Sequence, residues 1–193
     1  MKIGFCITGS FCTLKNIIEV LKKVVDEGHE VLPVFSYNVS NFDTRFYKAK
    51  DFENDVVSLT GKTPIKTIVE AEPMGTSKAV DLLLVAPCTG NSLSKIACGI
   101  TDTPVTMAVK ATLRNNKPVV LSVSSNDSLG ANARNIGTLL NTRNIFFVPF
   151  GQDDHIKKPN SLIADTSLIL PTCQMAIEGK QIQPLFVTNA THH

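Results

Sequence analysis

Short apolar runs alternate with longer amphipathic segments along the chain. Five of these runs are predicted to be strands: Lys2–Ile7, Glu30–Phe35, Asp81–Ala86, Pro118–Val123 and Ile145–Pro149. Between them lie segments in which apolar residues recur every three or four positions, as they do on one face of a helix. Strands that alternate with helices predict a parallel sheet with both faces covered.

The amphipathic segments predict six helices: Thr13–Glu27, Asp51–Leu59, Thr89–Cys98, Val105–Asn115, Leu129–Leu140 and Thr166–Glu178. Gly28 and Gly61 follow two of them, where glycine commonly ends a helix, and Pro104 stands where a helix commonly begins. Pro171 predicts a kink in the last helix, because proline lacks the N–H that a helix interior needs. Ile65–Val69 is expected to be a further short strand. Two long polar stretches are expected to be loops: Ser36–Tyr47 and Gly151–Asp165.

The chain length of 193 residues is sufficient for one domain with a substantial core. No linker, internal repeat or low-complexity tract divides it. We therefore expect one α/β domain over residues 1–187, a Rossmann-like or flavodoxin-like three-layer fold with a parallel sheet. Residues 188–193 are expected to be a tail, and the terminal Thr191-His192-His193 resembles part of a purification tag.

The composition and charge exclude several classes of function. The net charge of +2 is too small to indicate a nucleic-acid partner, and no apolar run is long enough to cross a membrane. The start of the chain lacks the pattern of a signal peptide, which predicts a cytoplasmic protein. The five cysteines form no Cys-x-x-Cys pair, so we expect no metal site and interpret most of them as small buried apolar residues.

Four loops that follow predicted strands are rich in hydroxyls, amides and glycine: 9–12, 36–38, 89–92 and 124–127. The carboxyl ends of parallel strands meet at one edge of a sheet, where such folds bind ligands. None of the four loops carries a cluster of lysine or arginine, so the rim suits a phosphate held by neutral donors beside a planar ring. The motifs GxGxxG and GxxxxGK[ST] are absent, which favours a mononucleotide over a dinucleotide or an NTPase site.

Two of these loops resemble motifs of a known family. Pro87–Ser92 is similar to the Pro-Ala-Ser-Ala-Asn-Thr motif of the homo-oligomeric flavin-containing cysteine decarboxylase superfamily at Pro87, Asn91 and loosely Ser92. Val123–Asn126 resembles the superfamily's Pro-x-Met-Asn motif and keeps only Asn126. The superfamily's catalytic histidine has no counterpart in this sequence. These departures argue against a decarboxylase.

The resemblance implies a flavoprotein-like domain that binds flavin mononucleotide (FMN). The phosphate is expected against residues of the first two loops: Gly9, Ser10, Phe11 and Ser36. The rest of the cofactor is expected against residues of the next two strands and loops: Pro87, Thr89, Gly90, Asn91, Ser92 and Ser124. Asn126 and Ser125 are the candidate catalytic residues, with Asn126 orienting the substrate or the flavin edge. For Asn126 a second interpretation stays open, a cap on the helix Leu129–Leu140.

Further runs are similar to one member of the superfamily, which is one of the two chains of its enzyme: Thr44–Phe46, Ile68–Pro73, Lys110–Asn115, Ser125–Asp127, Phe147–Asp153 and Lys158–Leu162. This likeness implies an oxidoreductase that helps aromatise a cyclic dihydro- or hydroxytetrahydro-dicarboxylate during spore formation, in the cytoplasm of the mother cell. It implies a partner chain that carries the NADP site, and a homo-oligomer built on trimers. The alternatives are a silent assembly protein for that partner, another FMN-dependent activity such as decarboxylation, and a small-molecule binding module.

A few charged residues have two interpretations. Arg45, Lys110 and Arg114 are candidates for binding substrate carboxylates, or else they are ordinary surface charges. Asp102 follows the predicted helix Thr89–Cys98 and is expected to cap the next helix rather than to take part in chemistry.

Overall fold

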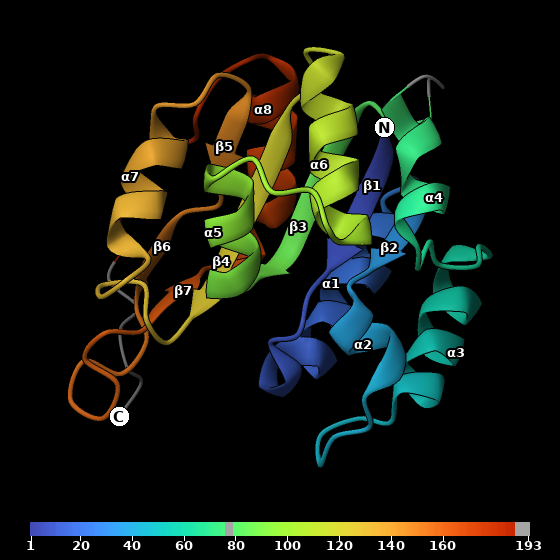
Figure 1. Cartoon of the computed structure of the whole chain (residues 1–193), viewed down its shortest axis with the longest axis horizontal. Helices are drawn as coiled ribbons and strands as arrows, with labels where there is room; N and C mark the ends of the chain where they lie inside the picture. The colour runs from blue at the N-terminus through green and yellow to red at the C-terminus, as the bar shows by residue number, and fades with distance from the viewer. Residues whose placement is uncertain (76–78, 188–193) are drawn as a thin grey trace.

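The computed structural model describes residues 1–75 and 79–187, and they form three layers with a sheet between helices. In Figure 1, α5 and α6 lie in front of the sheet and α8 lies behind it. The predicted three-layer α/β fold is confirmed. The tail predicted at 188–193 lies outside the described residues, and the domain boundary at residue 187 stays a prediction.

Five strands of the sheet run parallel, in the order β2-β1-β3-β4-β5. They are β1 Lys2–Ile7, β2 Glu30–Phe35, β3 Leu82–Cys88, β4 Val119–Ser125 and β5 Ile145–Phe147. This is the flavodoxin-like order, and the first two strands have the predicted bounds. β3 continues through Pro87 to Cys88, beyond its predicted end at Ala86, with a shift in register where proline offers no N–H.

The longer helices follow the predicted pattern: α1 Leu14–Asp26, α3 Ala49–Thr60, α5 Gly90–Ala97, α6 Pro104–Arg114, α7 Ala133–Leu140 and α8 Ile169–Ile177. Gly28 and Gly61 follow α1 and α3 with φ of +80° and +67°, a left-handed conformation that glycine adopts without strain. Pro104 occupies the first turn of α6 as expected.

The stretch Gly151–Asp165 was predicted to be a loop, and this is wrong at both ends. β6 Phe150–Gln152 and β7 Leu162–Ala164 pair antiparallel, and β7 pairs with the last two residues of β4. The sheet therefore has seven strands and is mixed rather than wholly parallel. The sequence did not indicate these two strands because each has only three residues, too few to show an alternation of apolar and polar positions.

Several other boundaries differ from the prediction. The expected loop Ser36–Tyr47 contains the short helix α2 Tyr37–Asn41, and the expected strand Ile65–Val69 is one bridge at Ile65 followed by α4 Ile68–Ala71. The helix predicted at Leu129–Leu140 begins only at Ala133. Pro171 produces no kink within a long helix, because α8 begins at Ile169 and proline is tolerated in a first turn.

The core lies on both faces of the central strands. Every residue of β3 is buried, as expected for a parallel strand covered on two sides. Phe5 and Ile7 of β1 and Phe35 of β2 are also fully buried. No helix within the described residues is long and apolar enough to cross a membrane.

Candidate functional site

The loops after β1 and β3 are joined by the hydroxyl of Thr8. Its Oγ1 donates to the carbonyl of Pro87 at 2.7 Å, and the N–H of Thr89 donates back to Oγ1 at 3.1 Å. β1 and β3 are neighbours, but the chain leaves them in opposite directions, toward β2 and toward β4. This is the switch point of the sheet, where folds of this order bind their ligand.

A small polar pocket of about 140 Å³ opens at this switch point. It is lined from the ends of three neighbouring strands and from the starts of three helices: Thr8, Gly9, Ser36, Tyr37, Asn38, Thr89, Asn91, Ser92, Lys95 and Thr103. Ser36 and Thr89 are the N-caps of α2 and α5 and accept hydrogen bonds from Val39 and Ser92 N–H. The pocket thus combines neutral hydroxyls and amides with the first turn of α5, an environment that favours an anion.

Gly9 leaves the space that this pocket needs. A Cβ on Gly9 would lie 3.3 Å from Cβ of Asn38 and 3.4 Å from the ring of Phe11, so any side chain would fill the space between these loops. The donors and the open cradle fit the phosphate of a mononucleotide. Gly9 and Ser36, which the sequence assigns to the phosphate, line this pocket together with Thr89, Asn91 and Ser92, which it assigns to the rest of the cofactor.

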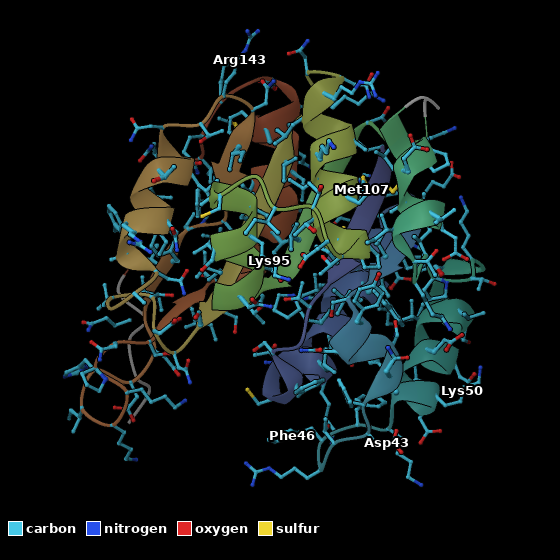
Figure 2. The ribbon with its side chains drawn as sticks, in the orientation of Figure 1. Asp43, Phe46, Lys50, Lys95, Met107 and Arg143 are labelled. Atoms are coloured by element: carbon cyan, nitrogen blue, oxygen red, sulfur yellow. The ribbon has the colours of Figure 1, made fainter. Side chains whose placement is uncertain are left out.

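Sequence reasoning missed Thr103 and Lys95 as members of the pocket. Lys95 is the charged one of the two. It lies on α5, one turn after Asn91, so the i, i+4 spacing places both side chains on one face and could have indicated it (Figure 2). Both oxygens of Asp102 accept from its ammonium at 2.8 Å, and this pairing lowers the pKa of Asp102. The expected capping role of Asp102 is wrong, because Thr103 is the N-cap of α6.

A larger cleft of about 680 Å³ lies on the other side of Gly9. Its lining includes Ser10 and Phe11 after β1 and Ser124, Ser125 and Asn126 at the end of β4. The hydroxyls of Ser10 and Ser124 lie 2.9 Å apart and join the two strand ends. Its volume is in the range of sites for cofactors and drug-sized ligands, so the cleft can hold a planar ring system beside the small pocket.

The two candidate catalytic residues have different surroundings. Asn126 is exposed at the cleft and makes no hydrogen bond with the described residues, which leaves its amide available to a ligand. Its alternative role as a helix cap is wrong, because α7 begins at Ala133 after Asn132. Ser125 donates its hydroxyl hydrogen to Asp127, so it serves the loop that carries Asn126.

Gly90 and Pro87 shape the site without lining either pocket. Gly90 is buried, and a Cβ there would lie within 2.6 Å of Ser125, Asp127 and Asn132 side chains. Pro87 lies inside β3, where its carbonyl accepts the hydrogen bond from Thr8. Gly90 sets how closely the loops after β3 and β4 approach each other, whereas Pro87 joins β3 to the residue that follows β1.

The five cysteines differ in burial. Cys6, Cys88 and Cys173 are buried as predicted, and burial raises the pKa of Cys88 and Cys173 to about 12. These thiols are therefore protonated at neutral pH and are poor nucleophiles. Cys12 and Cys98 are exposed, so most of the five cysteines are buried, as expected, but not all of them.

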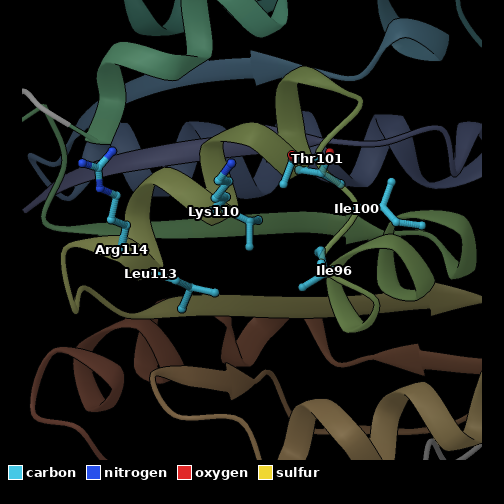
Figure 3. A pocket seen from close by; sticks show the side chains of 9 residues that line it. Ile96, Ile100, Thr101, Lys110, Leu113 and Arg114 are labelled. Carbon is cyan, nitrogen blue, oxygen red and sulfur yellow. The ribbon is translucent and has the colours of Figure 1, made fainter.

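The three candidate cations lie at two different places in the structure. Arg45 lines the large cleft, whereas Lys110 and Arg114 lie on α6 beside an apolar groove of about 460 Å³ between α5 and α6. Figure 3 shows Ile96 and Leu113 facing each other across that groove. The groove shares no lining residue with the large cleft or with the small pocket, so Lys110 and Arg114 are not positioned to bind a ligand in either of them.

Comparison with protein-family models matches residues 1–167 to the family described as Flavoprotein. The chain belongs to the flavoprotein family. The B subunit of dipicolinate synthase from Bacillus subtilis (strain 168) is 47% identical over 188 residues, which are 97% of this chain and 94% of that protein. Within the family this flavoprotein is a homologue of that protein, and the resemblance seen in the sequence is confirmed.

Solved structures agree with this placement. The crystal structure of the dipicolinate synthase B subunit from Bacillus halodurans has a TM-score of 0.89 and 41% identity, and the match covers 96% of this chain and 95% of that one. AnUbiX, solved in complex with FMN and dimethylallyl pyrophosphate, has a TM-score of 0.62 and 20% identity over 77% of each chain. At that identity the second likeness shows a shared fold alone.

Proposed function

We propose that this flavoprotein binds FMN at the switch point between β1 and β3 and acts as the B subunit of a dipicolinate synthase. With an A chain that carries NADP, it would help oxidise dihydrodipicolinate, or its hydroxytetrahydro precursor, to dipicolinate during sporulation. The observation that carries the proposal is the pair of cavities on the two sides of Gly9, one polar and small and the other wide. The identity of 47% to a dipicolinate synthase chain supports the substrate class.

The residues of the small pocket would hold the phosphate. Ser36, Thr89, Asn91 and Ser92 offer hydroxyl and amide donors, and the first turn of α5 adds backbone N–H groups. Lys95 contributes positive charge, part of which Asp102 compensates. Ser10, Phe11 and Ser124 would contact the remainder of the cofactor in the large cleft.

Conversion of a dihydropyridine to a pyridine releases one hydride and one proton. Bound FMN supplies a hydride acceptor, and so does the oxidised nicotinamide expected on the A chain. The chain's own contribution is to bind and orient the substrate: Asn126 presents a free amide at the cleft, and Phe11 presents an aromatic ring. The rigid ends of β1 and β4, joined through Ser10 and Ser124, hold these groups in place.

Flavin uptake tests the cofactor proposal. The purified protein, incubated with FMN and freed of excess cofactor, is expected to be yellow and to release flavin on heating. Ser10→Ala removes the bridge to Ser124 and a hydroxyl of the site, so it should weaken FMN binding about tenfold in a fluorescence titration. A protein that takes up no flavin would instead support the silent assembly role. Asn141→Ala, at the end of α7, is the control and should bind FMN as the parent does.

Activity tests the role of Asn126. With the A chain, NADP and the precursor supplied, Asn126→Ala should lower the rate of dipicolinate formation by about tenfold, the effect of one lost hydrogen bond. Its flavin content should equal that of the parent, since none of the residues assigned to FMN in the two cavities is altered. An unchanged rate would remove Asn126 from the site while leaving the FMN proposal standing.

A further inference from the structure

Two cations reach the large cleft from opposite ends of the sheet. Arg45 belongs to the segment between α2 and α3, beyond β2, whereas Lys158 belongs to the segment between β6 and β7, beyond β4. Both residues line the same cleft. The two segments lie at the lower edge of the molecule in Figure 1, on either side of the residues that follow β1.

Arg45 is held without using its hydrogen-bond donors. Its guanidinium carbon lies 4.7 Å from the centre of the Phe46 ring, a cation–π contact that restrains the side chain. It forms no ion pair with a carboxylate of the described residues. Its planar fork of N–H groups is therefore available to a carboxylate in the cleft.

Lys158 forms one ion pair and keeps further hydrogen-bond donors free. Its Nζ lies 2.6 Å from Oδ2 of Asp153, and this carboxylate raises the pKa of Lys158, which keeps the ammonium charged. An ammonium has three donors, and Asp153 takes one of them. Asp153 also lines the cleft, so the pair is nearly neutral as a whole, and Lys158 retains two N–H donors for a second acceptor.

We propose that Arg45 and Lys158 are the specificity-determining residues that bind the two carboxylates of a cyclic dicarboxylate across this cleft. The cofactor phosphate has its own pocket beyond Gly9, and the cleft offers the guanidinium of Arg45, the remaining N–H donors of Lys158 and the free amide of Asn126. That set of groups suits a planar ring with a carboxylate on each side, as in pyridine-2,6-dicarboxylate. The inference rests on the proposed function for the identity of the ligand.

Calorimetric titration of the protein, with FMN present, tests the pair directly. Pyridine-2,6-dicarboxylate is the probe, and pyridine-2-carboxylate is the comparison ligand with one carboxylate. Arg45→Gln and Lys158→Gln should each weaken binding of the dicarboxylate about tenfold, since each removes one charge-assisted contact. Each should weaken the monocarboxylate less, because the remaining cation can bind its single carboxylate.

Lys157→Gln is the matched control. Lys157 is the neighbour of Lys158, is exposed, and does not line the cleft. Its removal should leave dicarboxylate affinity within about twofold of the parent, because it changes the net charge without changing the site. An equal loss in Lys157→Gln would show a general charge effect and would overturn the proposal.

Three other results would also overturn it. They are no binding of the dicarboxylate to the parent protein, unchanged affinity in both single variants, and equal losses for the two ligands. Fluorescence titration with FMN separates this inference from the function on which it rests. Failure of the parent protein to bind FMN contradicts the cofactor site, whereas loss of FMN affinity in Arg45→Gln or Lys158→Gln would assign these cations to the cofactor instead of the substrate and overturn the inference.

Discussion

Gly90 is the residue on which the spacing of the site loops depends. It opens α5, and its missing side chain lets the loop after β3 lie against Ser125, Asp127 and Asn132. Asp127 accepts hydrogen bonds from Ser125 and Asn132, and Asn132 in turn accepts from Ser94 of α5 at 2.7 Å. This network fixes the position of the loop that presents Asn126.

Gly90→Ala should therefore destabilise the protein. Its Cβ would lie 2.5 Å from Oδ1 of Asp127 and 2.6 Å from side-chain atoms of Ser125 and Asn132, so the network must move. Overpacking of this kind costs about 1–3 kcal/mol in the free energy of unfolding, which urea denaturation measures. The same variant should weaken FMN binding, because the loop after β4 shifts. A variant as stable as the parent would contradict this packing role.

Single residues also show which parts of the site the sequence could predict. Ser36, Thr89 and Asn91 follow buried strands closely, so their position at the rim follows from topology. Lys95 reaches the small pocket from α5. Lys158 reaches the large cleft from the segment between β6 and β7, two strands that the sequence did not predict. Arg45 was a candidate, but its place depends on how a long segment folds over the rim.

At the scale of elements, the predicted helix bounds were accurate where the hydrophobic periodicity extends over many residues. α1 has five buried apolar residues at helical spacing, and its bounds were predicted within a residue. α7 is shorter than predicted because 127–132 form turns held by Asp127, whose carbonyl accepts from Gly130 and Asn132 N–H. Such local hydrogen bonds compete with a helix and leave no mark in hydrophobic periodicity.

A glycine in α7 gives a test with the opposite expected sign to Gly90→Ala. Gly137 lies within this helix, and a Cβ there meets no atom within 4 Å. Gly137→Ala should raise the free energy of unfolding by about 0.5–1 kcal/mol, because alanine loses less backbone entropy than glycine when the helix forms. Thermal unfolding followed by circular dichroism measures the gain. A loss of stability would show that the helix is not formed as described.

At the scale of the whole molecule, the site exists only when the sheet is assembled. Its residues follow β1, β2, β3 and β4, and the hydrogen bond between Ser10 and Ser124 joins positions 114 residues apart in the chain. That the first five strands run parallel could be inferred from the alternation of strands and helices, but their order could not. The added antiparallel pair β6–β7 could not, although it supplies Ser161, Leu162 and Ile163 to one side of the cleft.

Because the unfolded chain cannot gather these loops, FMN should bind the native state alone and stabilise it. At a free concentration about one hundred times Kd, this linkage adds about 2.7 kcal/mol to the free energy of unfolding. For a chain of this size each kcal/mol raises Tm by about 2–4 °C, so saturating FMN should raise Tm by about 5–10 °C. Thermal scans at increasing FMN concentration measure the shift.

Two variants test whether the rise in Tm comes from FMN bound at this site. Ser10→Ala should need about ten times more FMN for the same rise in Tm, because it weakens binding. Gly137→Ala should begin at a higher Tm and show the full rise, because α7 contributes no residue to either pocket. A parent protein whose Tm is indifferent to FMN would contradict the cofactor site. Equal shifts in the parent and Ser10→Ala would instead place FMN elsewhere on the molecule.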